Sequence, residues 1–163
     1  MVTSAGRWLL PAIVAALITI FVATIGATIT DLGPWYQQLK QPVWAPPDIL
    51  FGPAWTVIFG LCWISAVTGW MAAPTRLAGD TLIGLFAFNG FLNLLWSMLF
   101  FRAHRPDLAA YEVWLLWASI AALILACRRY SRAAAWLLVP YLLWVSFAAV
   151  LNQAVVALNA PFG

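Results

Sequence analysis

Tryptophan is the residue type in this sequence with the clearest chemical potential, since 11 of the 163 residues are tryptophan. Indole rings stack on flat aromatic molecules, and each ring pair adds roughly 0.5–1.5 kcal/mol beyond the burial of area. Two or three such rings would supply part of the approximately 8 kcal/mol that micromolar affinity requires. The tryptophans therefore indicate a binding site for a flat hydrophobic ligand.

Amide side chains within apolar segments form a second group of candidates, because a polar group in hydrocarbon needs a partner or a ligand. Asn89 and Asn93 are four residues apart and share a helix face, and Trp96 follows about one turn later. A later apolar segment adds Tyr141, Ser146, Asn152, Gln153 and Asn159. These groups either hydrogen-bond from helix to helix or face a ligand cavity, and the sequence leaves both readings open.

Catalytic and metal-binding patterns are missing from the sequence. Glu112 is the acidic residue within an apolar segment, and it serves either a structural role or a role in catalysis or proton movement. His104 lies in a short loop, where a solvated histidine is more common than a haem ligand. Cys62 and Cys127 lie in apolar runs without metal-ligand spacing, so we expect free thiols, no metal and no cofactor. Hydrolase and nucleotide-driven chemistry are unsupported.

The composition identifies the environment in which these residues must be positioned. The chain is 65% hydrophobic and 8% charged, whereas soluble domains are about 45–50% apolar and about 25% charged. A small soluble domain would need more charge to cover its surface. The net charge of +3 comes from short clusters between apolar runs, so we expect a lipid bilayer as partner and no nucleic acid.

The apolar segments predict an all-α membrane protein with a five-transmembrane-helix bundle. No linker separates them, so residues 1–163 form one expected domain. Residues 31–52 contain Pro34, Pro42, Pro46 and Pro47 and predict a long ordered loop. Asp80 is the expected N-cap of the third helix. The helices are expected at about residues 8–30, 53–71, 81–101, 107–127 and 133–158.

Three segments together resemble the tryptophan-rich sensory protein family, which includes TspO and the mitochondrial translocator protein, or peripheral-type benzodiazepine receptor. They are WYQQLKQPVWAPPDILFGPAW (35–55), LNLLWSMLFF (92–101) and LLVPYLLWVSFAAVLN (137–152). The resemblance implies a multi-pass protein of a bacterial-type cell membrane, assembled as a homodimer, with a pocket under the first loop. It also implies a receptor or regulator that binds protoporphyrin IX, other porphyrin-type tetrapyrroles and benzodiazepine-like ligands, with a role in tetrapyrrole homeostasis or stress signalling. The alternatives are a transporter of porphyrins or small molecules, and a light-dependent porphyrin-degrading enzyme.

The resemblance also implies the residues of the pocket. The ligand-binding residues by position are Tyr36, Trp44, Pro46, Pro47, Trp55, Asn93, Trp96, Trp144 and Ala148. If porphyrin degradation occurs, the resemblance implicates Trp35 and Trp144.

The sequence departs from the family pattern in three places. Leu108 replaces a tryptophan of the mammalian members and removes one porphyrin contact. No Lys or Arg follows Asn152, so cholesterol binding through the mammalian recognition segment is doubtful. On the third helix, which is the usual dimer face, the small residues Gly84, Ala87 and Gly90 are spaced by three.

Overall fold

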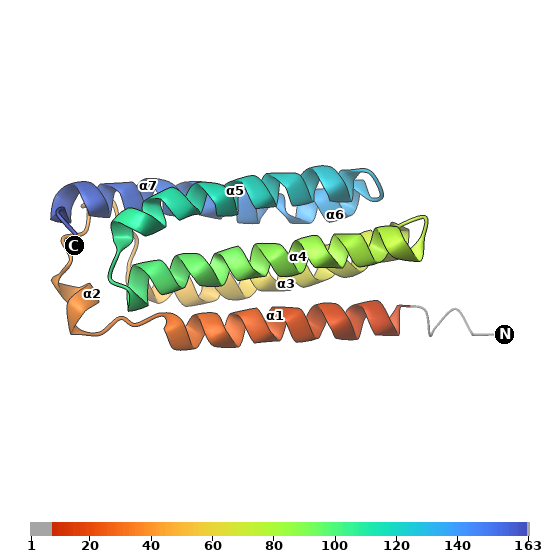
Figure 1. Ribbon diagram of the computed structural model, residues 1–163, viewed down its shortest axis with the longest axis horizontal. Coiled ribbons are helices and arrows are strands. Elements are labelled where there is room, and N and C mark those ends of the chain that lie inside the picture. Colours follow the sequence, from red (N-terminus) through yellow and green to blue (C-terminus); the bar gives the residue numbers. More distant parts are fainter. Residues whose placement is uncertain (1–7, 163) are drawn as a thin grey trace.

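The computed structural model describes residues 8–162, and long helices lying side by side make up most of it (Figure 1). α1 packs against α3 and α4, while α5 packs against α4 and α7. The described residues contain no β-strand. The long helices are α1 (Leu9–Ile29), α3 (Phe51–Ala72), α4 (Arg76–Ser97), α5 (Pro106–Arg128) and α7 (Val139–Asn159).

Within the described residues, five helical segments are long and apolar enough to cross a membrane. About 20 apolar residues at 1.5 Å each cross the hydrocarbon core, and the shortest of these segments has 21 residues. The prediction of an all-α, multi-pass membrane protein is therefore confirmed. The segments are Leu9–Ile29, Asp48–Ala72, Arg76–Arg102, Pro106–Arg128 and Arg132–Asn159.

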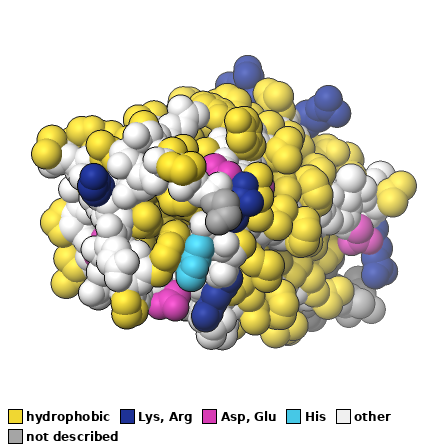
Figure 2. Space-filling view, turned by 60° about the vertical axis from the view of Figure 1, so that its left-hand side comes forward, with side chains coloured by type: hydrophobic (Ala, Val, Ile, Leu, Met, Phe, Trp, Pro, Cys, Tyr) yellow, Lys and Arg dark blue, Asp and Glu magenta, His cyan; other side chains and the backbone are white. Residues whose placement is uncertain are grey.

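The surface agrees with a membrane environment. Figure 2, in which the end that carries the first loop is turned forward, shows hydrophobic side chains over most of the visible surface and few charged ones. Large side chains that are more than half exposed, such as Phe21, Leu125 and Leu143, belong to spanning helices. In water such a surface would be an interaction or aggregation site, whereas in a bilayer lipid covers it.

The start of the third span differs from the prediction. α4 begins at Arg76, and the hydroxyl of Thr75 accepts a hydrogen bond from the backbone N–H of Ala78 at 3.2 Å. The prediction that Asp80 caps this helix is wrong, because Asp80 lies inside α4 and pairs with Arg76, with 3.6 Å between Asp80 Oδ2 and Arg76 Nε. Thr75 has the extended backbone of an N-cap residue, which Asp80, inside the helix, lacks.

The last span consists of two helices. α6 (Arg132–Leu137) is followed after Leu138 by α7, which has Pro140 in its first turn. Proline has no N–H to donate, so it is accommodated where a helix begins. The hydroxyl of Ser131 caps α6 by accepting from Ala134 N at 3.2 Å.

The loop between α1 and α3 contains two short helical turns. They are α2 (Pro34–Gln38) and the 3₁₀ turn η2 (Asp48–Leu50). At the same end of the bundle, α4 continues into the π-helical turn η3 (Met98–Arg102). The loop therefore crosses the ends of the helices that supply the predicted pocket residues (Figure 1).

Candidate functional site

Two polar contacts stabilise the loop, one within the loop and one between the loop and the bundle. Tyr36 donates its phenol hydrogen to Asp48 Oδ1 at 2.8 Å. Burial of the phenol and this bond to Asp48 raise the pKa of Tyr36 above its ordinary value, so the phenol keeps its hydrogen at neutral pH. The Asn159 side chain accepts from Lys40 N at 2.8 Å and donates to Lys40 O at 2.9 Å. The loop is thus tied to the C-terminal end of α7.

Contacts to the end of η3 and to the residues that follow it hold the beginning of the loop. The Arg102 guanidinium donates to the Thr28 carbonyl near the end of α1. Its Nη1 lies 3.9 Å from Asp31 Oδ2. Trp35 stacks on His104 with 4.1 Å between ring centroids and 12° between ring planes. His104 is exposed, as expected, and it also provides a platform for a loop tryptophan.

Aromatic side chains form one cluster between α3 and α7, which we call the α3–α7 aromatic cluster. Trp55 and Trp144 face each other edge to face with 6.5 Å between their centroids. The loop residue Trp44 reaches this cluster through Phe147, at 6.1 Å. The members are Trp44, Phe51, Trp55, Phe59, Tyr141, Trp144 and Phe147. Rings from the loop and two helices therefore converge here.

A second group, which we call the α4 aromatic cluster, surrounds the end of α4. Trp96 stacks on Phe100 at 5.3 Å, and Trp35 meets Phe100 edge to face at 6.2 Å. Tyr36 lies 5.8 Å from Phe101. The members are Trp35, Tyr36, Trp96, Phe100, Phe101 and His104. The tryptophans of the predicted pocket are thus divided between two clusters, with Trp96 packed against the hydrophobic cores that underlie both.

The remaining predicted residues lie beside these clusters. Ala148 is half-buried, one turn beyond Trp144 on α7. Pro46 is half-buried and Pro47 is exposed in the loop after Trp44. These positions border the α3–α7 aromatic cluster along the chain.

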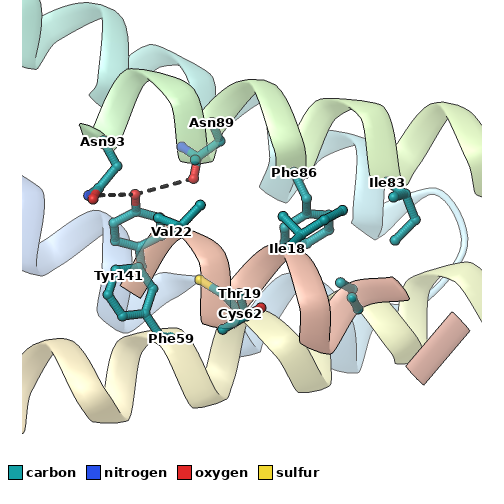
Figure 3. Close-up of a pocket in the computed structure, with 13 residues that line it drawn as sticks. Ile18, Thr19, Val22, Phe59, Cys62, Ile83, Phe86, Asn89, Asn93 and Tyr141 are labelled. Atoms are coloured by element: carbon teal, nitrogen blue, oxygen red, sulfur yellow. Dashed lines mark hydrogen bonds between the residues drawn. The ribbon is translucent and has the colours of Figure 1, made fainter. Parts of the chain in front are cut away.

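The intramembrane amides are linked in hydrogen-bond networks between helices. Tyr141 donates to Asn89 Oδ1 at 3.2 Å and accepts from Asn93 Nδ2 at 3.4 Å (Figure 3). Asn89 also donates to Ser119 on α5 at 2.8 Å. Helix-to-helix bonding, one of the two readings that the sequence left open, thus occurs for both amides.

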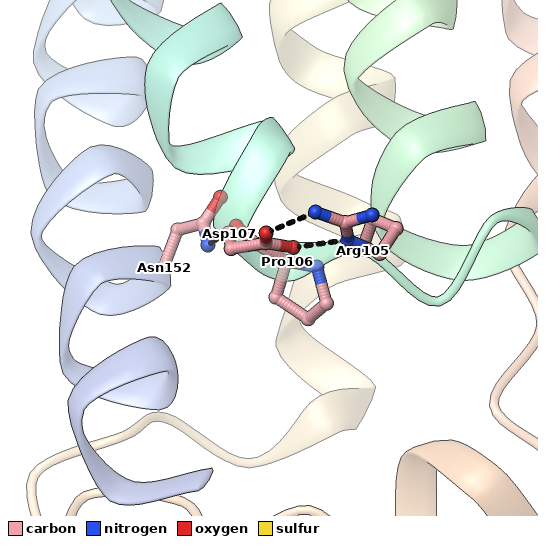
Figure 4. Close-up of polar contacts among 4 residues, drawn as sticks. All are labelled: Arg105, Pro106, Asp107 and Asn152. Atoms are coloured by element: carbon pink, nitrogen blue, oxygen red, sulfur yellow. Dashed lines mark hydrogen bonds and ion pairs between the residues drawn. The ribbon is translucent and has the colours of Figure 1, made fainter. Parts of the chain in front are cut away.

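Asn152 makes a second link, between α4, α5 and α7. It accepts from Trp96 Nε1 at 3.1 Å and donates to the carbonyl of Pro106 at 2.9 Å. Figure 4 shows Asn152 on α7 beside this first turn of α5. The first bond orients the indole of Trp96. The second fixes the position of α7 along the axis of α5.

A cavity of about 40 Å³ lies between α1, α3 and α4, with Tyr141 of α7 at its wall (Figure 3). Asn93 is the member of the predicted set that lines it, together with Asn89 and Tyr141. Because one water needs about 10–15 Å³ by this measure, the cavity suits a few waters. A flat ligand would require the aromatic rings to move apart. Within residues 8–162, no three His, Cys, Asp or Glu side chains meet as metal ligands.

Some residues of the site were absent from the prediction. Phe51 and Phe147 complete the ring contacts of Trp144, and Asp48 holds Tyr36. Phe147 is three residues after Trp144, so helical spacing could have placed the two on one face. The partner of Tyr36 is twelve residues away across an irregular loop, where no periodic pattern applies.

Known proteins resemble this chain over most of its length. A tryptophan-rich protein TspO of Chlorobaculum tepidum is 40% identical over 77% of this chain and 79% of its own length. A tryptophan-rich sensory protein of Cereibacter sphaeroides is 34% identical over 88% of this chain and 92% of its own. A translocator protein of Ovis aries is 34% identical over 72% of this chain and 70% of its own.

The family comparison agrees with the helices and with the relatives. The model of the TspO/MBR family matches residues 12–158, a range that begins within α1 and ends within α7. The matched range includes the loop and both aromatic clusters. The chain therefore belongs to the TspO/MBR family of integral membrane proteins.

Proposed function

We propose that the protein is a membrane receptor or regulator that binds porphyrin-type tetrapyrroles such as protoporphyrin IX. Benzodiazepine-like hydrophobic ligands would use the same site. The proposed role is in tetrapyrrole homeostasis or stress signalling, and one relative is named a sensory protein. The binding residues would be those predicted above, from Tyr36 in the loop to Ala148 on α7.

The observation that carries this proposal is the convergence of Trp44, Trp55 and Trp144 from three separate segments. Packing alone does not require tryptophan at each of these positions, because contacts between membrane helices are commonly built from small residues that let the backbones approach closely. Flat rings set edge to face can instead rotate and stack on an inserted flat ligand. Protoporphyrin IX offers such a face.

Ligand binding at this site requires the loop to loosen. The described cavity is far too small for a tetrapyrrole, and Trp44 is held against Phe147 while the loop is tied by Asn159. The part of the loop around Trp44 is held by one ring contact and by the bonds between Lys40 and Asn159, so its opening costs little compared with unfolding a helix. The loop would therefore act as a cover whose release admits the ligand.

A titration with protoporphyrin IX tests the binding site. Trp144→Ala should weaken the affinity at least about tenfold, which corresponds to about 1.4 kcal/mol. The readout is the shift of the porphyrin absorption band, which does not depend on the number of tryptophans. The matched control is Trp136→Ala, because Trp136 is 72% exposed on α6 and outside both clusters. Equal affinities for Trp144→Ala and the wild type would remove the α3–α7 aromatic cluster from the site.

Transport is the alternative favoured by the name translocator, which the Ovis aries relative carries. A transporter should move protoporphyrin from one face of a protein-containing liposome to the other faster than empty liposomes do. A receptor should bind the same ligand and leave the leak rate unchanged.

Light-dependent degradation of the porphyrin is the other alternative, and it concerns Trp35 and Trp144. These residues lie in different aromatic clusters, so both would contact one substrate only if it bridged the clusters. Illumination should bleach protoporphyrin faster with the wild type than with the Trp35→Phe, Trp144→Phe double variant. Equal bleaching rates would exclude a role of these two residues.

A further inference from the structure

Glu112 is a buried carboxyl group without a partner. It is 5% exposed on α5, within the membrane-spanning part of the helix. Neither Oε1 nor Oε2 has a hydrogen-bond partner among the described residues. A carboxylate here would leave an unpaired charge, and a neutral acid would leave its O–H unused, so either form is costly. Such groups are uncommon in folded proteins and tend to mark function.

The other acidic residues of the chain all have polar partners. Asp48 accepts from Tyr36, Asp80 pairs with Arg76, and Asp31 accepts from Gly33 N at 2.9 Å. Asp107 accepts from Arg105 Nε at 2.8 Å (Figure 4). These four acids lie in the loop or near helix ends, where water also reaches them. Glu112 thus differs from the rest of its residue class in both burial and pairing.

No positive charge of the described chain reaches the bundle interior beside Glu112. The described basic residues lie in loops or near the ends of helices: Lys40, Arg76, Arg102, Arg105, Arg128, Arg129 and Arg132. Their described acidic partners are the aspartates named above. A partner for the Glu112 carboxyl would therefore have to come from outside the described chain.

The face of α5 that carries Glu112 packs into two cores that contain aromatic rings. Glu112 lies on the buried face of α5 between Ala109 and Leu116. Ala109 belongs to a hydrophobic core that includes Trp96. Leu116 belongs to a second core, which includes Trp96, Tyr141 and Trp144. A carboxyl group on a helix face that packs into these cores would attract an organic ammonium group by charge, and the rings of the cores would add cation–π attraction.

We propose that Glu112 recognises a basic nitrogen, so that the site favours flat aromatic ligands that carry an amine over neutral ligands of the same shape. The inference rests on the proposed function in one respect, since it takes the aromatic clusters as the ligand site. The amine would donate to the orphaned carboxyl while the aromatic body of the ligand separates the rings.

Two matched probes test this preference, namely 1-pyrenemethylamine and 1-pyrenemethanol, which differ in the amine and the hydroxyl. Binding is measured by equilibrium dialysis with the full chain in phosphatidylcholine nanodiscs at neutral pH, where the amine is protonated. Protein-free nanodiscs correct for partition into lipid. We expect the wild type to bind the amine about tenfold more tightly than the alcohol.

Two variants locate the preference. Glu112→Gln should bring the affinity ratio of the probes close to one, because the amide keeps the shape and loses the charge. Asp80→Asn removes a carboxylate that is already paired near the start of α4, and it should keep the preference. The circular dichroism spectrum and melting temperature of Glu112→Gln, compared with the wild type, check that the variant is folded.

The outcomes separate the inference from the proposed function. Equal affinities of the two probes in the wild type, or a preference that survives in Glu112→Gln, would overturn the role of Glu112. The wild-type comparison needs no variant and so holds even if Glu112→Gln fails to fold. If the wild type prefers the amine but does not bind protoporphyrin, the porphyrin proposal would be overturned instead.

Discussion

Tyr36 shows how much of the loop depends on single side chains. Its bond to Asp48 joins α2 to the turn before α3, and its ring packs near Phe101. The resemblance assigned Tyr36 to the ligand site by position, and the structure adds that its hydroxyl donates to Asp48, a pairing that the quoted motif did not indicate. The sequence could predict that Asn89 and Asn93 lie on one helix face, because they are four residues apart. It could not predict a contact across an irregular loop, where residue spacing does not determine which side chains meet.

We expect Tyr36→Phe to loosen the loop while the bundle remains folded. The variant keeps the ring and loses a hydrogen bond worth about 0.5–1.5 kcal/mol. The backbone amides between residues 40 and 47, at the positions other than proline, should exchange with solvent several-fold faster, as measured by hydrogen exchange with mass spectrometry.

Tyr111→Phe is the matched control for this change, because Tyr111 is 78% exposed on α5 and makes no side-chain hydrogen bond among the described residues. Its exchange should equal that of the wild type. Unchanged exchange of residues 40–47 in Tyr36→Phe would show that the Asp48 contact does not hold the loop.

The helices illustrate what hydropathy predicts and what it misses. Five apolar segments of about 20 residues were sufficient to predict the spans, because a bilayer requires that length. Their boundaries depend on caps and prolines, so α4 begins at the Thr75 cap and the last span breaks at Leu138 before Pro140. Hydropathy does not distinguish a capping hydroxyl from an acid one turn later.

We expect Gly79→Ala to destabilise the contact between α3 and α4. A Cβ at position 79 would meet the indole ring of Trp70, so the ring or the helix must shift. Such overpacking costs about 1–3 kcal/mol. The melting temperature in detergent should fall by several degrees.

Gly60→Ala provides the comparison on α3, since nothing lies within 4 Å of the position that its Cβ would occupy. Alanine favours a helix over glycine by about 1 kcal/mol. This variant should melt at or above the wild-type temperature. A Gly79→Ala protein as stable as Gly60→Ala would contradict the close packing of Trp70.

For the molecule as a whole, the homodimer implied by the resemblance remains a prediction. Substitutions on the outer face of α4 can test it. Gly84 faces open space, and Ala87 is exposed on the same helix. Gly90 instead packs against Val22 of α1, where an added Cβ would lie 2.8 Å from Val22 Cγ2. Of the three small residues in the sequence pattern, Gly84 and Ala87 therefore remain accessible to a second chain, whereas Gly90 packs within its own chain.

We expect Gly84→Leu to lower the dimer fraction at least about tenfold, because helix contacts in membranes require small residues for close approach. Native mass spectrometry of protein released from detergent measures this fraction. Gly60→Leu adds the same side chain to an equally open position on α3 and should leave the fraction unchanged. Equal dimer fractions in both variants would place the dimer contact elsewhere.

The most direct test of the central claim is mass spectrometry of small molecules that remain bound through purification from cells supplied with a tetrapyrrole precursor. The proposed function predicts that wild-type protein retains a porphyrin at a fixed ratio to the chain. Trp136→Ala, altered outside both aromatic clusters, should retain it equally, and Trp144→Ala should lose it. Wild-type protein without any porphyrin, or equal porphyrin retention by Trp144→Ala and Trp136→Ala, would contradict tetrapyrrole binding at the α3–α7 aromatic cluster.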